Sequence, residues 1–188
     1  MRYRSFPVFL AACLVLPALA APGDAPGVPN FHRVDEHVFR GGQPVDAGWN
    51  SLAHLGIKLV IDLRPPAEHP VKAEEKAVRQ AGMEYVNIPM KGIGVPDRDA
   101  VSKVLALMLS PAGGPVFVHC RRGADRTGTV VACYRIEHDH WTNQKALLEA
   151  RSLGMSWVER GMMRYIVGFK PEAAPLASGA VPVPVVGQ

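Results

Sequence analysis

Apolar residues follow two different spacings along the middle of the chain. Short, nearly continuous apolar runs at 57–63, 83–88 and 115–119 are typical of strands that are buried on both faces of a sheet. A further short strand is predicted at 34–40. Apolar residues at helical spacing predict helices over 47–55, 71–81, 97–109, 127–138, 142–151 and 157–169.

Strands that alternate with helices in this way predict an α/β fold with one central, mostly parallel sheet flanked by helices on both faces. The 188 residues leave room for a single domain, which we assign to residues 30–170. With 48% apolar and 20% charged residues, the chain has the composition of a protein with a buried core. Sheets of this class bind ligands at the carboxyl ends of their central strands.

The first twenty residues have the features of a secretory signal peptide (1–20). Arg2 and Arg4 form a basic start, an apolar stretch at 6–19 follows, and Ala18-Leu19-Ala20 fits a cleavage site before Ala21. The apolar stretch is too short to span a bilayer comfortably, so no stable membrane insertion is expected after cleavage. The sequence therefore predicts an exported protein, periplasmic or secreted, with a lipoprotein anchor at Cys13 as the less favoured alternative.

Two segments next to the predicted domain have a different composition. Residues 21–29 are rich in proline and glycine and are predicted to form a linker, and 171–188 are predicted to form a disordered tail. Cleavage of the leader removes two arginines and lowers the formal net charge from +4 to +2. So weak a positive charge, without a long basic run, argues against nucleic acid or a membrane surface as a partner.

The most informative segment is 119–128, which lies between a predicted strand and a predicted helix. In it, five residues separate Cys120 from Arg126. Such a loop turns backbone N–H groups inward, and the helix N-terminus adds partial positive charge, so the loop suits a tetrahedral oxyanion. The residues expected to bind that anion are Arg121, Arg122, Gly123, Ala124, Asp125 and Thr127.

The two ends of this loop carry the chemistry. Positive charge favours the thiolate form of Cys120, and a thiolate is a nucleophile. The planar guanidinium of Arg126 can hold two phosphate oxygens at once. Thr127 is expected to donate its hydroxyl to the sulfur when the sulfur departs, and His119 to order the loop.

The second cysteine of the domain, Cys133, is not expected to form a disulfide with Cys120. It would lie about 10 Å further along the helix axis, whereas bridged Cα atoms lie within about 7 Å of each other. No Cys-x-x-Cys or His-x-x-x-His spacing is present, so the sequence predicts no metal and no other cofactor.

Segment 119–128 resembles the Cys-x5-Arg signature loop of the protein tyrosine phosphatase superfamily, in its dual-specificity branch. Residues 39–44, 60–64 and 134–154 also resemble parts of that family, and the leader makes exported bacterial members the nearest likeness. The resemblance implies a phosphatase fold and a phosphomonoesterase that forms a phosphocysteine intermediate. Its expected substrate is a phosphotyrosine protein, with phosphoserine, phosphothreonine and other phosphomonoesters as further candidates.

The same resemblance implies an aspartate upstream of the cysteine as general acid. Residues 90–92 lack a carboxylate, and the next candidate is Asp97, which equally suits the N-cap of the following helix. Asp125, inside the loop, is the alternative acid. We favour Asp97 and leave the choice open.

Three other functions are compatible with parts of the loop. Arg121 and Arg122 add more positive charge than one phosphate requires, which makes an inositol polyphosphate or phosphoinositide phosphatase the main alternative. Sulfur transfer is disfavoured by Arg126 and Thr127 at this spacing. A non-catalytic phosphate-binding module is disfavoured because the nucleophile and the anion-binding arginine are both present.

Overall fold

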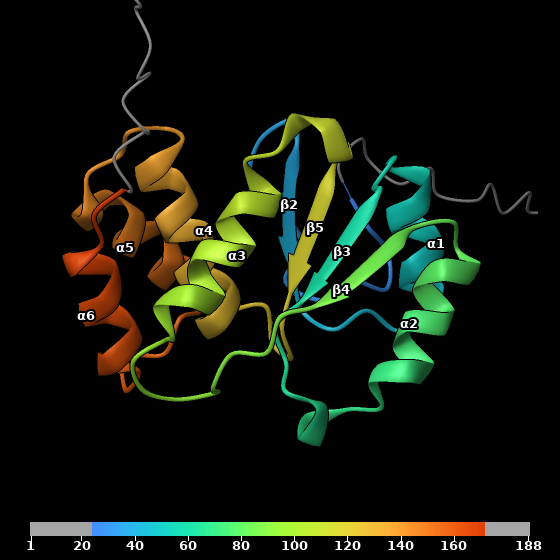
Figure 1. Cartoon of the computed structure of the whole chain (residues 1–188), viewed down its shortest axis with the longest axis horizontal. Helices are drawn as coiled ribbons and strands as arrows, with labels where there is room; N and C mark the ends of the chain where they lie inside the picture. Colours follow the sequence, from blue (N-terminus) through green and yellow to red (C-terminus); the bar gives the residue numbers. More distant parts are fainter. Residues whose placement is uncertain (1–23, 172–188) are drawn as a thin grey trace, which may run out of the picture.

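The computed structural model describes residues 24–171 (Figure 1). The predicted signal peptide at 1–20 lies outside this range, as does the predicted tail at 171–188 apart from its first residue. Within the described residues, no helix is both long enough and apolar enough to cross a membrane.

One five-stranded sheet forms the centre of the fold. The strands are β1 (His32–Arg33), β2 (Val38–Gly41), β3 (Leu59–Asp62), β4 (Glu84–Asn87) and β5 (Val116–His119). They are arranged in the order β1-β2-β5-β3-β4, and only β1 runs antiparallel to its neighbour. The predicted α/β fold with a mostly parallel sheet is therefore confirmed, with β5 in the central position.

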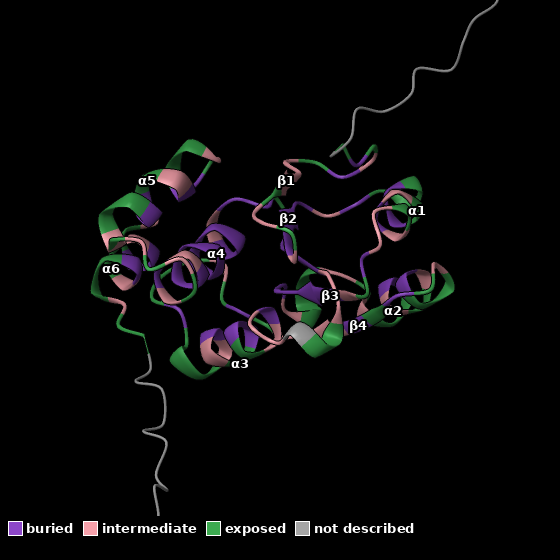
Figure 2. Cartoon of the chain, turned by 90° about the horizontal axis from the view of Figure 1, so that it is seen from above, coloured by how far each residue is buried: buried purple, intermediate pink, exposed green. Residues whose placement is uncertain are grey.

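Within residues 24–171 there are six α-helices, of which three lie between strands in the chain and three follow the last strand, and two short 3-10 helices. The α-helices are α1 (Asp46–His54), α2 (Val71–Gln80), α3 (Arg98–Met108), α4 (Asp125–Glu137), α5 (Asn143–Ser152) and α6 (Arg160–Gly168). The 3-10 helices are η1 (Pro66–Glu68) and η2 (Pro111–Gly113). Figure 2 shows α1 and α2 on one face of the sheet and α3 to α6 on the other.

The strands bury both of their faces because successive side chains point to opposite sides. Val116 and Val118 of β5 pack with α3 and α4, whereas Phe117 between them packs with Trp49 of α1 and Val78 of α2. Both clusters are almost free of solvent-exposed surface, which explains the nearly continuous apolar runs in the sequence.

Two local predictions differ from the structure. The predicted linker at 21–29 is shorter than expected, because Ala25 and Val28 are buried in the cluster around Trp49. The strand predicted at 34–40 is interrupted by a turn in which the Asp35 carboxylate accepts hydrogen bonds from the backbone N–H groups of His37 and Val38, both at 2.7 Å. Side-chain capping of a turn competes with the strand ladder at this point.

The fold brings the end of β2 into direct contact with the loop that follows β5. Gly123 in that loop has a φ of +70°, and a Cβ placed on it would lie 2.3 Å from the carbonyl carbon of Gly41 and 2.4 Å from the nitrogen of Gly42. Only glycine accommodates both the left-handed backbone and this close approach.

We expect Gly123→Ala to destabilise the protein by at least about 2 kcal/mol and to disorder the loop, because the new Cβ meets backbone atoms that cannot move independently. Urea unfolding measures the effect. The matched control is Gly113→Ala in η2, where no atom lies within 4 Å of the new Cβ. Similar stability for the two variants would contradict the importance of this contact.

Candidate active site

The loop between β5 and α4 lies at the carboxyl end of the central strand, along the lower edge of the sheet in Figure 1. A cavity of about 240 Å³ opens over it. The cavity is lined by Gly92, Cys120, Arg121, Arg122, Asp125, Arg126 and Glu159. The predicted nucleophile and the predicted anion-binding arginine thus share one small pocket, in which Cys120 is only 3% exposed.

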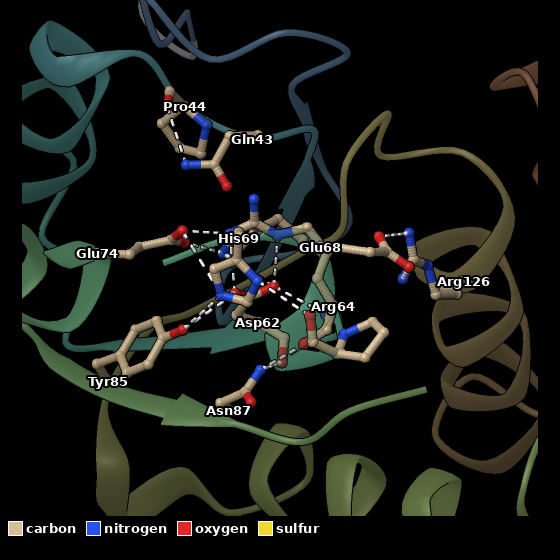
Figure 3. Close-up of polar contacts among 12 residues, drawn as sticks. Gln43, Pro44, Asp62, Arg64, Glu68, His69, Glu74, Tyr85, Asn87 and Arg126 are labelled. Atoms are coloured by element: carbon tan, nitrogen blue, oxygen red, sulfur yellow. Dashed lines mark hydrogen bonds and ion pairs between the residues drawn. The ribbon is translucent and has the colours of Figure 1, made fainter. Parts of the chain in front are cut away.

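Arg126 is held in place by a carboxylate that the sequence analysis did not identify. Its Nη1 and Nη2 atoms donate to Oε1 and Oε2 of Glu68 at 3.0 and 2.9 Å, and Nη1 also lies 3.5 Å from the Met90 carbonyl oxygen (Figure 3). This two-point contact uses the end of the guanidinium. The side edge formed by Nε and Nη2 remains available for two oxygens of an oxyanion.

A second, buried arginine stabilises the loop through a hydrogen bond to its backbone. Arg40 is 1% exposed and donates through Nη2 to the Gly123 carbonyl oxygen at 2.6 Å, and Asn30 donates to the same oxygen at 3.0 Å. Burial lowers the pKa of Arg40 to about 10, so the guanidinium is still a cation at neutral pH. The charge of Arg40 therefore adds positive electrostatic potential to the loop that is predicted to bind the anion.

Asp125 lines the cavity, but both of its carboxylate oxygens are already engaged. One pairs with Arg122, and the other accepts a hydrogen bond from the backbone N–H of Ser156 at 2.8 Å. Asp125 therefore ties the start of α4 to the segment that precedes α6.

Asp97 caps a helix in this structure. Its Oδ1 accepts hydrogen bonds from the backbone N–H groups of Asp99 at 2.8 Å and Ala100 at 3.3 Å, which satisfies the N-terminus of α3. Asp97 does not belong to the wall of the cavity. The N-cap alternative is thus observed, while a catalytic role for Asp97 stays a prediction.

Three of the residues predicted to bind the anion, Gly123, Ala124 and Thr127, are buried and do not line the cavity. Gly123 and Ala124 are buried in the loop, and Thr127 lies in the first turn of α4 with no exposed surface. Its hydroxyl has no hydrogen-bond partner among residues 24–171, so the expected bond to the Cys120 sulfur is not formed here.

The sequence analysis missed Glu68 and Glu159. Glu159 lines the cavity from the segment before α6, and its carboxylate has no hydrogen-bond or ion-pair partner in the described part of the chain. Neither residue belongs to a sequence motif with a fixed spacing from Cys120. Only the general rule that a buried arginine needs an acidic partner pointed toward a residue such as Glu68.

Comparison with known proteins shows to which family the chain belongs. A family model described as "DSP-PTPase phosphatase fused to NAD+ Kinase" matches residues 24–162. The chain belongs to this dual-specificity phosphatase family.

Two relatives with similar sequences are named for different phosphatase activities. Inositol diphosphatase DSP4 of Arabidopsis thaliana is 33% identical over 111 residues, which cover 56% of this phosphatase and 54% of that protein. Dual specificity protein phosphatase TpbA of Pseudomonas aeruginosa (strain UCBPP-PA14) is 29% identical over 126 residues, covering 66% and 55%. The phosphatase spans about half the length of these relatives.

Solved structures agree with the fold. The crystal structure of P. aeruginosa TpbA has a TM-score of 0.64 at 26% identity and covers 78% of this phosphatase and 92% of that chain. A cysteine-to-serine variant of TpbA has been crystallised in complex with pTyr; this chain has a TM-score of 0.63 at 25% identity and covers 77% and 91%. The catalytic core of Siw14 from S. cerevisiae, a PP-IP phosphatase, has a TM-score of 0.67 at 24% identity and covers 78% and 89%, a likeness of fold.

Behind the loop of the phosphatase lies a buried ionic network (Figure 3). Asp62 at the end of β3 accepts bonds from Nε and Nη2 of Arg64, both at 2.9 Å, and its Oδ2 lies 2.7 Å from Nε2 of His69. Glu74 pairs with Arg64 and lies 3.2 Å from Nε2 of His119, the residue before the nucleophile. Neither ring nitrogen of His119 has a hydrogen-bond partner among residues 24–171, so its expected role in ordering the loop by hydrogen bonds stays a prediction.

Ionised Asp62 is the centre of this network. Burial by itself would raise the pKa of Asp62, but the hydrogen bonds from Arg64 and the proximity of His119 outweigh it and hold the pKa below its ordinary value of 3.8. A carboxylate with a lowered folded-state pKa stabilises the protein above its unfolded-state pKa, and this contribution is lost as the pH falls through the folded-state value.

We expect Asp62→Asn to lower the free energy of unfolding by about 3–5 kcal/mol, because it removes the buried carboxylate that accepts hydrogen bonds from the Arg64 guanidinium and the Tyr85 hydroxyl. The difference from the unchanged protein should be constant near neutral pH and shrink below about pH 4. Urea unfolding at several pH values measures it. Exposed Asp46→Asn is the control, and a pH-independent Asp62→Asn effect would contradict the assignment.

Proposed function

We propose that this protein is a cysteine-dependent phosphomonoesterase that hydrolyses phosphotyrosine, and also phosphoserine and phosphothreonine, in proteins. One observation carries the proposal: Cys120 and Arg126 share a cavity of about 240 Å³ at the carboxyl end of β5. A nucleophile next to a preformed anion site is what in-line phosphoryl transfer needs. The complex of the TpbA variant with pTyr supports this substrate class.

In the first step, the Cys120 thiolate attacks phosphorus and the ester oxygen leaves with the electron pair of the P–O bond and takes up a proton. In the second step, a water molecule attacks the phosphocysteine, phosphate is released and the thiolate is restored. The Nε–Nη2 edge of Arg126 holds equatorial oxygens of the phosphoryl group in both steps, with Glu68 fixing its plane.

We expect Cys120→Ser to lower turnover of p-nitrophenyl phosphate by at least about 10⁴-fold, since the hydroxyl is a far weaker nucleophile at neutral pH. Binding of a phosphotyrosine peptide should remain measurable by calorimetry. Cys133→Ser, at a buried cysteine of α4, is the matched control and should stay active. Near-normal turnover by Cys120→Ser would refute the mechanism.

An inositol polyphosphate or phosphoinositide is the second candidate substrate. Arg121 is exposed at the cavity wall and has no acidic partner within residues 24–171, so it is available for a second phosphate. The name of DSP4, an inositol diphosphatase, favours the same candidate. Turnover measured side by side on phosphotyrosine peptides and on inositol phosphates decides between the two, and activity confined to inositol phosphates would overturn the first.

For the proton donor we favour Glu159 over the two aspartates considered from the sequence. The Asp97 carboxylate caps α3 and both oxygens of Asp125 are engaged, whereas the half-buried Glu159 carboxylate lies on the cavity wall and has no hydrogen-bond or ion-pair partner among residues 24–171. The cavity is small enough for a group on its wall to reach the leaving oxygen of a bound ester.

We expect Glu159→Gln to slow hydrolysis of phenyl phosphate by about 10²-fold or more while slowing p-nitrophenyl phosphate far less, because only the poor leaving group needs a proton. Steady-state kinetics on both esters measures the ratio. Asp97→Asn and Asp125→Asn are tested in parallel, and whichever variant alone shows this selectivity identifies the acid.

Export is part of the proposal. It is supported by the basic start, the apolar stretch at 6–19 and the cleavage site before Ala21. Mass spectrometry of the protein recovered from a periplasmic extract should show a chain that begins at Ala21. A full-length chain in the cytoplasmic fraction would contradict export.

A further inference from the structure

Two loop tips beside the cavity expose bulky apolar side chains. Ile93 and Val95 lie before α3 and are 75% and 59% exposed, and Trp157 and Val158 lie before α6 and are 68% and 57% exposed. We call these four residues the apolar rim. They are four of the seven large hydrophobic residues exposed in the described part of the chain.

The two tips are packed against each other. A Cβ placed on Gly161, at the start of α6, would lie 2.3 Å from the carbonyl carbon of Gly94 and 2.7 Å from the nitrogen of Val95. Trp157 and Val158 occupy the middle of a turn closed by a hydrogen bond of 3.2 Å from the Glu159 N–H to the Ser156 carbonyl oxygen. The apolar rim is therefore one surface made of two segments far apart in the sequence.

This surface borders the mouth of the cavity. Gly92 and Glu159, each next to a rim residue in the chain, form part of the cavity wall, and the tip that carries Trp157 is fixed to Asp125 through Ser156. None of the four rim residues lines the cavity itself. They project from loop tips outside it.

Charged side chains lie near the apolar rim, and they include the unpaired carboxylate of Glu159 on the cavity wall as well as three exposed cations. Lys91, Arg121 and Arg160 are exposed beside the rim or the cavity, and none of the three has an acidic partner among the described residues. A projecting tryptophan with branched aliphatic neighbours and unpaired cations is the combination found on proteins that bind the interfacial region of anionic bilayers.

We propose that the apolar rim docks on the surface of an anionic lipid bilayer and turns the mouth of the cavity toward it. A bilayer accommodates projecting side chains without a complementary pocket, whereas an extended peptide needs a groove or a sheet edge. The docking rests on the proposed function only in that the cavity accepts phosphate groups, and it requires no transmembrane segment.

Tryptophan fluorescence with vesicles tests this directly. Of the three tryptophans, Trp49 is 5% exposed, the half-buried Trp141 has the cationic groups of Arg135 and Lys145 over its ring, and only Trp157 is largely exposed. The protein lacking the leader (residues 21–188) is used, because the apolar stretch at 6–19 would itself bind lipid. Vesicles of equal parts phosphatidylglycerol and phosphatidylcholine should shift the emission to the blue and sediment with the protein, and added salt should weaken both effects.

The double variant Ile93→Ser, Trp157→Ser should bind these vesicles at least about tenfold more weakly, because it loses the two largest apolar side chains of the apolar rim. Leu148→Ser, at a 58% exposed position on α5, is the matched control and should bind like the unchanged protein. In the absence of vesicles, both variants should hydrolyse p-nitrophenyl phosphate at the normal rate, and Cys120→Ser should still bind vesicles.

Three results would overturn the docking proposal: no blue shift or sedimentation at low salt, equal loss of binding in Leu148→Ser, or a rim that is required for phosphotyrosine-peptide affinity but not for vesicles. The last result would assign the surface to a protein substrate. Failure of the proposed function is separate, since it would appear as absent hydrolysis with vesicle binding intact.

Discussion

The rest of the site depends on one backbone constraint, the left-handed conformation of Gly123 with its Cα pressed against the backbone of Gly41 and Gly42. This contact fixes the loop after β5 to the end of β2. The Gly123 carbonyl oxygen can then accept hydrogen bonds from Arg40 and Asn30, and the chain enters α4 with Arg126 in its first turn. The position of this loop, which begins with Cys120, thus depends on that single turn.

Placing so many cations in one loop requires carboxylates to position them. Glu68 holds the guanidinium of Arg126, Asp125 pairs with Arg122, and Glu74 lies between Arg64 and His119. These three acids are engaged with cations and orient them. Among the two carboxylates that line the cavity, Asp125 and Glu159, only Glu159 has no partner within the described residues, which is the basis of the proposal that it transfers the proton.

The same segment that brings Glu159 to the cavity also carries half of the apolar rim. Ser156 is bonded to Asp125, and Gly161 packs against Gly94, so the two loop tips, Glu159 and the loop of Cys120 form one connected unit. The short stretch before α6 therefore links the proposed proton donor to the proposed docking surface. The low net charge of the chain gives no indication of this surface, because net charge does not show that the exposed cations Lys91, Arg121 and Arg160 lie near the mouth of the cavity.

The sequence by itself determined the features that depend on local spacing. Apolar runs at 57–63 and 115–119 gave the buried strands, helical spacing gave the helices, and the five residues between Cys120 and Arg126 identified the anion-binding loop and the family resemblance. Asp97 remained ambiguous, since a cap and a catalytic acid have the same local pattern. Only the tertiary structure decided which carboxylates reach the loop. Glu68 and Arg126 are 58 residues apart, and such contacts are set by the order of strands and the packing of loops, which leave no periodic trace in the chain.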